Sequence, residues 1–183
     1  MKQLGDVLKS IRSAYHFKYS DLQEIVHIVD MDGAYIPDDD ILEDPEAEKP
    51  IYSPTAIRSK NRLGIINRNT NKRSCLDRIS ATPSLAGIPY QVYYMSSNLD
   101  HVLYNKQNST DMEKENDAYV FAEKYQHNLN DFLRFITESD FSVGGSYTES
   151  WDFIKQGRHS LERHTNLGIC ISRAISTRNS SEW

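Results

Sequence analysis

The chain has 183 residues, of which 38% are hydrophobic, and a formal net charge of −5, which suits a single domain with or without a small addition. Its longest apolar runs, residues 25–29 and 92–95, are far shorter than the roughly 18 residues of a membrane span, so no membrane partner is expected. Residues 1–6 lack the apolar centre of a signal peptide, and Cys75 and Cys170 form no CxxC pair, so we expect a cytoplasmic protein without a zinc knuckle or a disulfide framework.

A helix followed by a strand is predicted at the start of the chain. Leu4, Val7, Leu8 and Ile11 follow the i, i+3, i+4, i+7 spacing of a helix with one buried face. Residues 25–29, Ile-Val-His-Ile-Val, are mostly β-branched, which indicates a strand covered on both faces, as in a parallel sheet.

The next segments differ sharply in charge. Residues 38–50 are acidic and contain Pro45 and Pro50, which predicts an exposed loop. Nine acidic residues and no basic one occur between residues 30 and 48, whereas residues 58–78 contain seven basic residues and one acidic residue. Adjacent acidic and basic segments suit a site for a metal ion and a phosphate, and mutual neutralisation on the surface is the alternative.

The rest of the chain continues the alternation of strands and helices and then becomes helical. Strands are predicted at residues 63–67 and 91–95, with a helix at residues 70–80 between them. Beyond residue 96 the pattern is helical, and Ser/Thr-x-x-Asp/Glu capping signatures begin at Ser97, Thr110 and Ser146.

This order of elements predicts an α/β fold with a mostly parallel, Rossmann-like sheet and a helical C-terminal half. The expected division is a sheet domain over residues 1–105 that carries the acidic loop 38–50, a helical cap over residues 106–172 and a flexible tail over residues 173–183.

The leading candidate site is the sequence Asp30-Met31-Asp32-Gly33 at the end of the first predicted strand. In an open α/β sheet, ligands gather at the carboxyl ends of strands. The two carboxylates converge once the chain turns, and Gly33 permits that turn. Because two hard oxygen ligands with room for water and phosphate oxygens suit Mg²⁺ or Mn²⁺, we expect Asp30 and Asp32 to bind metal and to act in chemistry at phosphorus. The alternative is a strand-end turn that uses Asp and Gly for backbone reasons.

A second candidate site follows the strand at residues 91–95, where the chain opens a helix whose free N–H groups favour a phosphate or a carboxylate. An ordinary capped helix is the alternative. With the basic segment added, the predicted phosphate- and substrate-binding residues are Ser96, Asn98, His101, Arg68, Lys72 and Arg73.

The strand that ends in Asp30-Met31-Asp32, with a later strand leading into residues 96–103, resembles the Toprim-like proteins of the RloB and abortive-infection type. The resemblance spans roughly residues 20–105. It implies a Rossmann-like sheet, Mg²⁺ at Asp30 and Asp32, and phosphodiester chemistry on nucleic acid in defence against phages or mobile elements. Such domains also carry a glutamate at the end of an earlier strand, whereas here only a helix precedes the strand. The resemblance therefore also allows a chain that lacks the start of the domain, or a non-catalytic domain that binds a protein partner encoded in the same operon.

An apolar strand followed by Asp-x-Asp-Gly also resembles the first motif of haloacid-dehalogenase-type phosphatases. That resemblance implies that Asp30 is the nucleophile and Asp32 the general acid, with Ser96 as the second-motif hydroxyl and Lys155 as the lysine. The later acidic pair of the family is not recognisable in this chain, and residues 34–36 replace the small residues that usually follow the motif.

Overall fold

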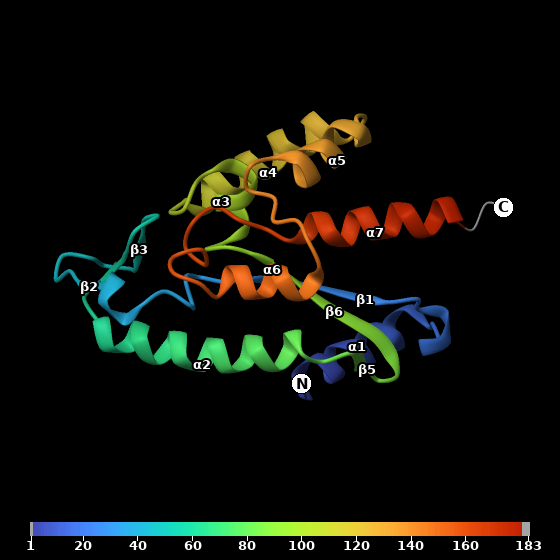
Figure 1. The fold of residues 1–183 in the computed structure, drawn as a ribbon, viewed down its shortest axis with the longest axis horizontal. Coiled ribbons are helices and arrows are strands. Elements are labelled where there is room, and N and C mark those ends of the chain that lie inside the picture. Colours follow the sequence, from blue (N-terminus) through green and yellow to red (C-terminus); the bar gives the residue numbers. More distant parts are fainter. Residues whose placement is uncertain (1, 181–183) are drawn as a thin grey trace.

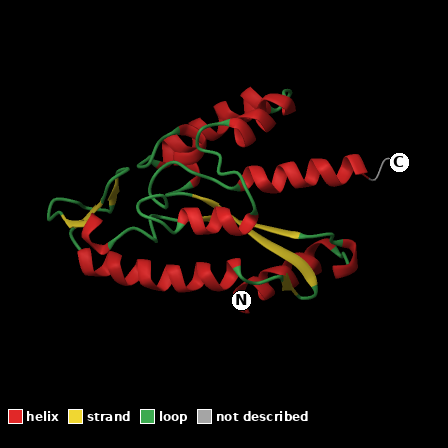
Figure 2. Ribbon diagram, in the orientation of Figure 1, coloured by secondary structure: helices red, strands yellow, loops and turns green. Residues whose placement is uncertain are grey.

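The computed structural model describes residues 2–180 and confirms the α/β class (Figure 1). Coloured by secondary structure, the chain consists mostly of helices and loops, with two small sheets between them (Figure 2). The helices are α1 (Lys2–Tyr15), α2 (Arg62–Ser80), α3 (Leu99–Tyr104), α4 (Asp111–Tyr125), α5 (Leu129–Glu138), α6 (Tyr147–Ile154) and α7 (Leu167–Ser180). The strands are β1 (Ile25–Asp30), β2 (Ile41–Glu43), β3 (Ile51–Tyr52), β4 (Ile57–Ser59), β5 (Ser84–Leu85) and β6 (Ile88–Met95).

Two small mixed sheets replace the expected mostly parallel, Rossmann-like sheet. The first has the order β1-β6-β5, in which β1 is parallel and β5 antiparallel to β6. The second has the order β2-β4-β3, with β2 parallel and β3 antiparallel to β4. The strand predicted at residues 63–67 is wrong, because this segment forms the first turns of α2. Asn61 begins that helix by accepting a 2.9 Å hydrogen bond from the Gly64 N–H through its side chain, an N-cap that outweighs the local β propensity.

The core is built around β6, whose two faces are both covered. Tyr90, Val92 and Tyr94 pack on one face with residues of α2 and α6. On this face the Tyr94 ring meets the Trp151 ring edge-on at 5.5 Å, and the Trp151 indole N–H donates to the Val92 carbonyl. The aromatic run of β6 is therefore the central buried strand of the fold.

Strand β1 is only half covered, which differs from the prediction that both of its faces are buried. Ile25 and Val29 pack against the core, but Val26 and Ile28 point the other way and are 43% and 47% exposed. The run of β-branched residues indicated the strand correctly. It could not show that β1 lies at the edge of its sheet with β6 as the neighbour on one side.

The C-terminal part of the chain packs directly on β6. Asn166 is fully buried: its Oδ1 accepts a 2.8 Å bond from the Tyr94 N–H, and its Nδ2 donates to Ser150 Oγ at 3.0 Å. Helix α7 then continues to Ser180, across the expected boundary at residue 172, and residues 181–183 lie outside the described part of the chain. No helix within residues 2–180 is long and apolar enough to cross a membrane.

Candidate functional site

The turn after β1 places the Asp30–Gly33 segment beside the end of β6. Because the two strands are parallel, Asp30 pairs with Met95 at the same edge of the sheet. The Asp32 N–H donates to the Ser97 carbonyl at 2.7 Å. Asp32 and Gly33 have φ angles of 49° and 65°, so two consecutive left-handed residues turn the chain, as expected from an Asp-Gly pair.

Burial and two neighbouring carboxylates, those of Asp32 and Asp100, act on Asp30. Although its side chain reaches the surface, the surrounding protein removes part of its hydration, and this desolvation is the main cause that raises the pKa of Asp30. The negative charge of Asp32 raises the pKa further, and that of Asp100 adds to it. The Lys72 ammonium and a hydrogen bond from the Leu99 N–H act in the opposite direction. Asp30 therefore lies in a locally negative environment that a cation would relieve.

Helix α2 supports this turn from the side. Lys72 forms an ion pair with the Asp32 carboxylate. The Arg68 guanidinium donates to the Asp32 carbonyl at 2.9 Å and to the Tyr52 hydroxyl at 2.6 Å, so Arg68 anchors the turn to neighbouring elements. Arg73 instead approaches Asp38 at 3.4 Å. Of the three predicted basic residues, only Lys72 thus pairs with a carboxylate of the Asp30–Gly33 segment. Arg68 contacts the backbone of that segment, and Arg73 lies against the acidic segment.

The residues predicted to bind substrate after β6 are engaged inside the fold. Ser96 is fully buried, and its Oγ accepts a 2.6 Å bond from the His164 N–H. Asn98 caps α3 by accepting from the His101 N–H at 2.9 Å, one position after the predicted cap at Ser97. His101 is only 4% exposed, and burial lowers its pKa to about 4, so its ring is neutral near pH 7. Asn98 therefore acts as a helix cap and Ser96 as an internal tie, whereas Nδ1 of the buried His101 ring has no hydrogen-bond partner within residues 2–180.

Asp100 is the acidic residue that sequence reasoning missed as part of this site. It lies in the first turn of α3 and approaches Lys114 at 3.9 Å. The signal was present, because an acid five positions after the end of β6 lies close to the carboxyl edge of the sheet. The capping signature that begins at Ser97 indicates only a capping role for Asp100, and in the structure Asn98 is the N-cap instead of Ser97.

Asp30 and Asp32 are the two residues that could hold a divalent ion. Among the described residues, no group of three or more His, Cys, Asp or Glu side chains converges on one point. An ion at the end of β1 would therefore take its remaining ligands from water and from a substrate, as Mg²⁺ commonly does. Lys155, the candidate lysine of the phosphatase resemblance, pairs with Asp77 at 2.8 Å instead.

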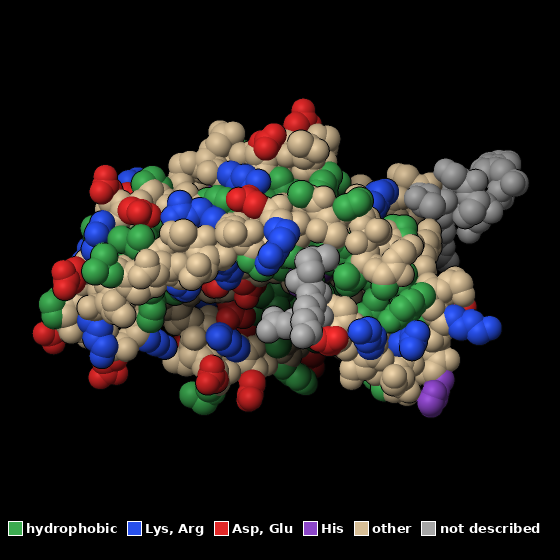
Figure 3. Space-filling model, turned by 90° about the horizontal axis from the view of Figure 1, so that it is seen from below, with side chains coloured by type: hydrophobic (Ala, Val, Ile, Leu, Met, Phe, Trp, Pro, Cys, Tyr) green, Lys and Arg blue, Asp and Glu red, His purple; other side chains and the backbone are tan. Residues whose placement is uncertain are grey.

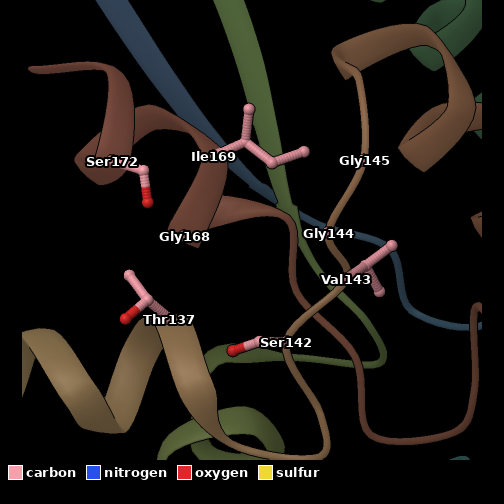
Figure 4. Close-up of a pocket in the computed structure, with 8 residues that line it drawn as sticks. All are labelled: Thr137, Ser142, Val143, Gly144, Gly145, Gly168, Ile169 and Ser172. Carbon is pink, nitrogen blue, oxygen red and sulfur yellow. The ribbon is translucent and has the colours of Figure 1, made fainter. Parts of the chain in front are cut away.

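The surface shows a charged hollow and an uncharged cavity. On the face seen from below, acidic side chains lie deep in a hollow with Lys and Arg side chains around it, so opposite charges are intermixed (Figure 3). The cavity drawn in Figure 4, of about 210 Å³, is lined by hydroxyls, glycines and two aliphatic side chains, without a charged group. Its chemistry does not suit a metal ion.

Known proteins provide no assignment for this arrangement. No family model matches the chain, and no curated protein or solved structure is significantly similar to it. Function is therefore inferred from the side chains at the end of β1.

Proposed function

We propose that Asp30 and Asp32 bind Mg²⁺ or Mn²⁺ and that the chain performs phosphodiester or phosphoryl-transfer chemistry, as a Toprim-like nuclease would. The observation that carries the proposal is the charge around Asp30. Desolvation and the charges of Asp32 and Asp100 raise its pKa, and Lys72 is the cation whose charge opposes them. A divalent cation bound at this point would offset the excess negative charge and complete the site.

The residues of this chain would divide the work in a defined way. Asp30, on the last residue of β1, and Asp32, in the turn, would supply the protein ligands. Lys72, which pairs with Asp32, would be the nearest ammonium for a non-bridging phosphate oxygen. The bound ion would orient the phosphate and stabilise the negative charge that develops on it. Arg68 would keep Asp32 in place through its contact with the backbone carbonyl of that residue.

The parallel β1–β6 pair supports the Toprim-like part of this proposal. Ligand sites at the carboxyl ends of parallel strands are typical of Rossmann-like sheets, and the aspartates occupy that position here. A nuclease of this kind would act on nucleic acid in the cytoplasm, in defence against phages or mobile elements. Its basic segment, residues 58–78, would contribute to binding the phosphate backbone.

The proposal is tested by incubating the purified chain with labelled single- and double-stranded DNA and RNA in the presence of Mg²⁺ or Mn²⁺. Cleavage should depend on the metal and disappear in Asp32→Asn, whereas Asp39→Asn, an exposed acid of the neighbouring acidic segment, should retain it. Absence of cleavage of every nucleic acid with either metal would refute a nuclease.

A non-catalytic binding domain is the second candidate, and the Lys72–Asp32 ion pair favours it. A lysine that already neutralises one of two carboxylates gives the turn a purely structural explanation. A protein encoded in the same operon that co-purifies with the chain would support this candidate, and metal-dependent turnover by the chain alone would exclude it. The phosphatase alternative requires Asp32 as general acid. If Asp32→Asn still hydrolyses a generic phosphate ester, a haloacid-dehalogenase-type phosphatase is excluded.

A further inference from the structure

A segment from the C-terminal half of the chain, residues 158–165, contacts the turns after β1 and β6. Its Ser160 is fully buried. The Ser160 carbonyl accepts a 3.1 Å bond from the Gly33 N–H and a 2.9 Å bond from the Ser97 N–H. The Ser160 hydroxyl oxygen accepts a third bond, at 3.0 Å, from the Tyr35 N–H. One residue thus joins the turn after β1 to the turn after β6.

The two turns need this support because both contain strained backbone. Asp32 and Ser97 have φ angles of 49° and 52°, in the left-handed region that residues with a Cβ atom adopt only at an energetic cost. The Asp32 N–H donates to the Ser97 carbonyl, so each turn also depends on the other. Backbone in such a conformation persists where the surrounding bonds over-determine it, and the three bonds to Ser160 do so here.

The segment that carries Ser160 is itself fixed on both sides of that residue. Before it, the Arg158 guanidinium pairs with both carboxylate oxygens of Asp40, at 2.7 and 2.6 Å. After it, the His164 N–H donates to Ser96 Oγ at 2.6 Å, and the His164 carbonyl accepts from the Ser96 N–H at 2.9 Å. Because the rest of the fold holds both flanks, Ser160 is a fixed point to which the turns are attached.

We propose that Ser160 is a positioning residue of the metal site, which holds the turn after β1 in the conformation in which Asp30 and Asp32 share an ion. The inference rests on the metal site proposed above. Removing the Ser160 hydroxyl leaves the Tyr35 N–H without its partner, and the turn then adopts other conformations for part of the time. The apparent affinity falls in proportion to the fraction of molecules that can bind. Ser160→Ala should therefore weaken Mg²⁺ binding by about fivefold, the lower end of typical couplings.

Calorimetric titration with Mg²⁺ separates this role from a general loss of stability. Ser150→Ala is the matched control, because Ser150 is also fully buried and its Oγ likewise accepts a bond, from Asn166 Nδ2 at 3.0 Å. It should destabilise the fold at least as much as Ser160→Ala and leave the dissociation constant for Mg²⁺ unchanged. Ser160→Cys keeps a weak acceptor of similar size, so its affinity should lie between those of the native chain and Ser160→Ala. This variant also provides the test if Ser160→Ala is poorly folded.

Amide hydrogen exchange measures the positioning itself. Without metal, the Asp32, Gly33 and Ser97 amides should exchange faster in Ser160→Ala than in Ser150→Ala, because only the former loosens the two turns, and Mg²⁺ should slow them again. If the native chain binds Mg²⁺, then equal affinity in Ser160→Ala, or unchanged exchange of these amides, would overturn the role of Ser160 and leave the metal site intact. No binding by the native chain would instead refute the metal site, and the role of Ser160 with it.

Discussion

Replacing Lys72 by methionine should strengthen metal binding at the end of β1. The ammonium of Lys72 and a bound ion would share the Asp32 carboxylate, one on each oxygen, with about 6 Å between the two cations. Coulomb's law for a divalent and a monovalent cation at about 6 Å in water gives about 1.4 kcal/mol of repulsion. The permittivity of water gives a lower limit to this repulsion, because the Lys72 and Asp32 side chains are only 26% and 34% exposed. Removing the ammonium should therefore tighten Mg²⁺ binding by about tenfold or more.

Isothermal titration calorimetry of the native chain and Lys72→Met measures this change. Lys155→Met is the matched control, since Lys155 pairs with a different aspartate, Asp77, and is exposed to a similar extent. It should leave the dissociation constant for Mg²⁺ unchanged. Nuclease activity at saturating Mg²⁺ should fall in Lys72→Met, because the phosphate loses its nearest ammonium. An unchanged or weaker affinity for Mg²⁺ in Lys72→Met would refute the view that lysine and metal compete for Asp32.

Three further predictions concern the stability of the fold. Asn166→Ala should lower the free energy of unfolding by about 2–4 kcal/mol in urea titrations, because it leaves the buried Tyr94 N–H and the Ser150 hydroxyl without their partner; a loss below about 1 kcal/mol would contradict this. Gly33→Ala should cost about 1–2 kcal/mol in the same assay, since Gly33 has a φ of 65°. The pKa of His101 is about 4 in the fold, so the unfolded chain binds a proton first, and stability should fall as the pH drops from about 6.5 towards 4; His101→Gln should weaken this dependence, and His27 and His164, whose pKa values burial also lowers, should retain the remainder.

The sequence predicted elements well where one local signal determines the structure. The capping signatures beginning at Thr110 and Ser146 are confirmed, because a hydroxyl and a carboxylate three residues apart satisfy backbone N–H groups without help from the rest of the fold. The turn at Asp32-Gly33 is confirmed because these two residues readily adopt the left-handed backbone conformation that it requires. Strand β6 was also predicted, although it begins three residues earlier than expected, at Ile88.

Features that depend on distant contacts could not be predicted in this way. The segment at residues 63–67 has the composition of a strand, but the Asn61 cap and packing under the second sheet make it helical. Burial of β1 depends on whether another layer of the fold packs over each face of its sheet, which local periodicity does not reveal. Likewise, Ser96 follows a strand as a substrate-binding serine would, but a segment 68 positions further along the chain donates to its hydroxyl.

The metal-binding claim for Asp30 and Asp32 is tested most directly by calorimetric titration with Mg²⁺ and Mn²⁺. The native chain and Asp39→Asn should show saturable binding, and Asp30→Asn and Asp32→Asn should lose it while circular dichroism shows the native fold. No saturable binding by the native chain, or equal binding by Asp32→Asn, would contradict the claim and leave the segment as a structural turn.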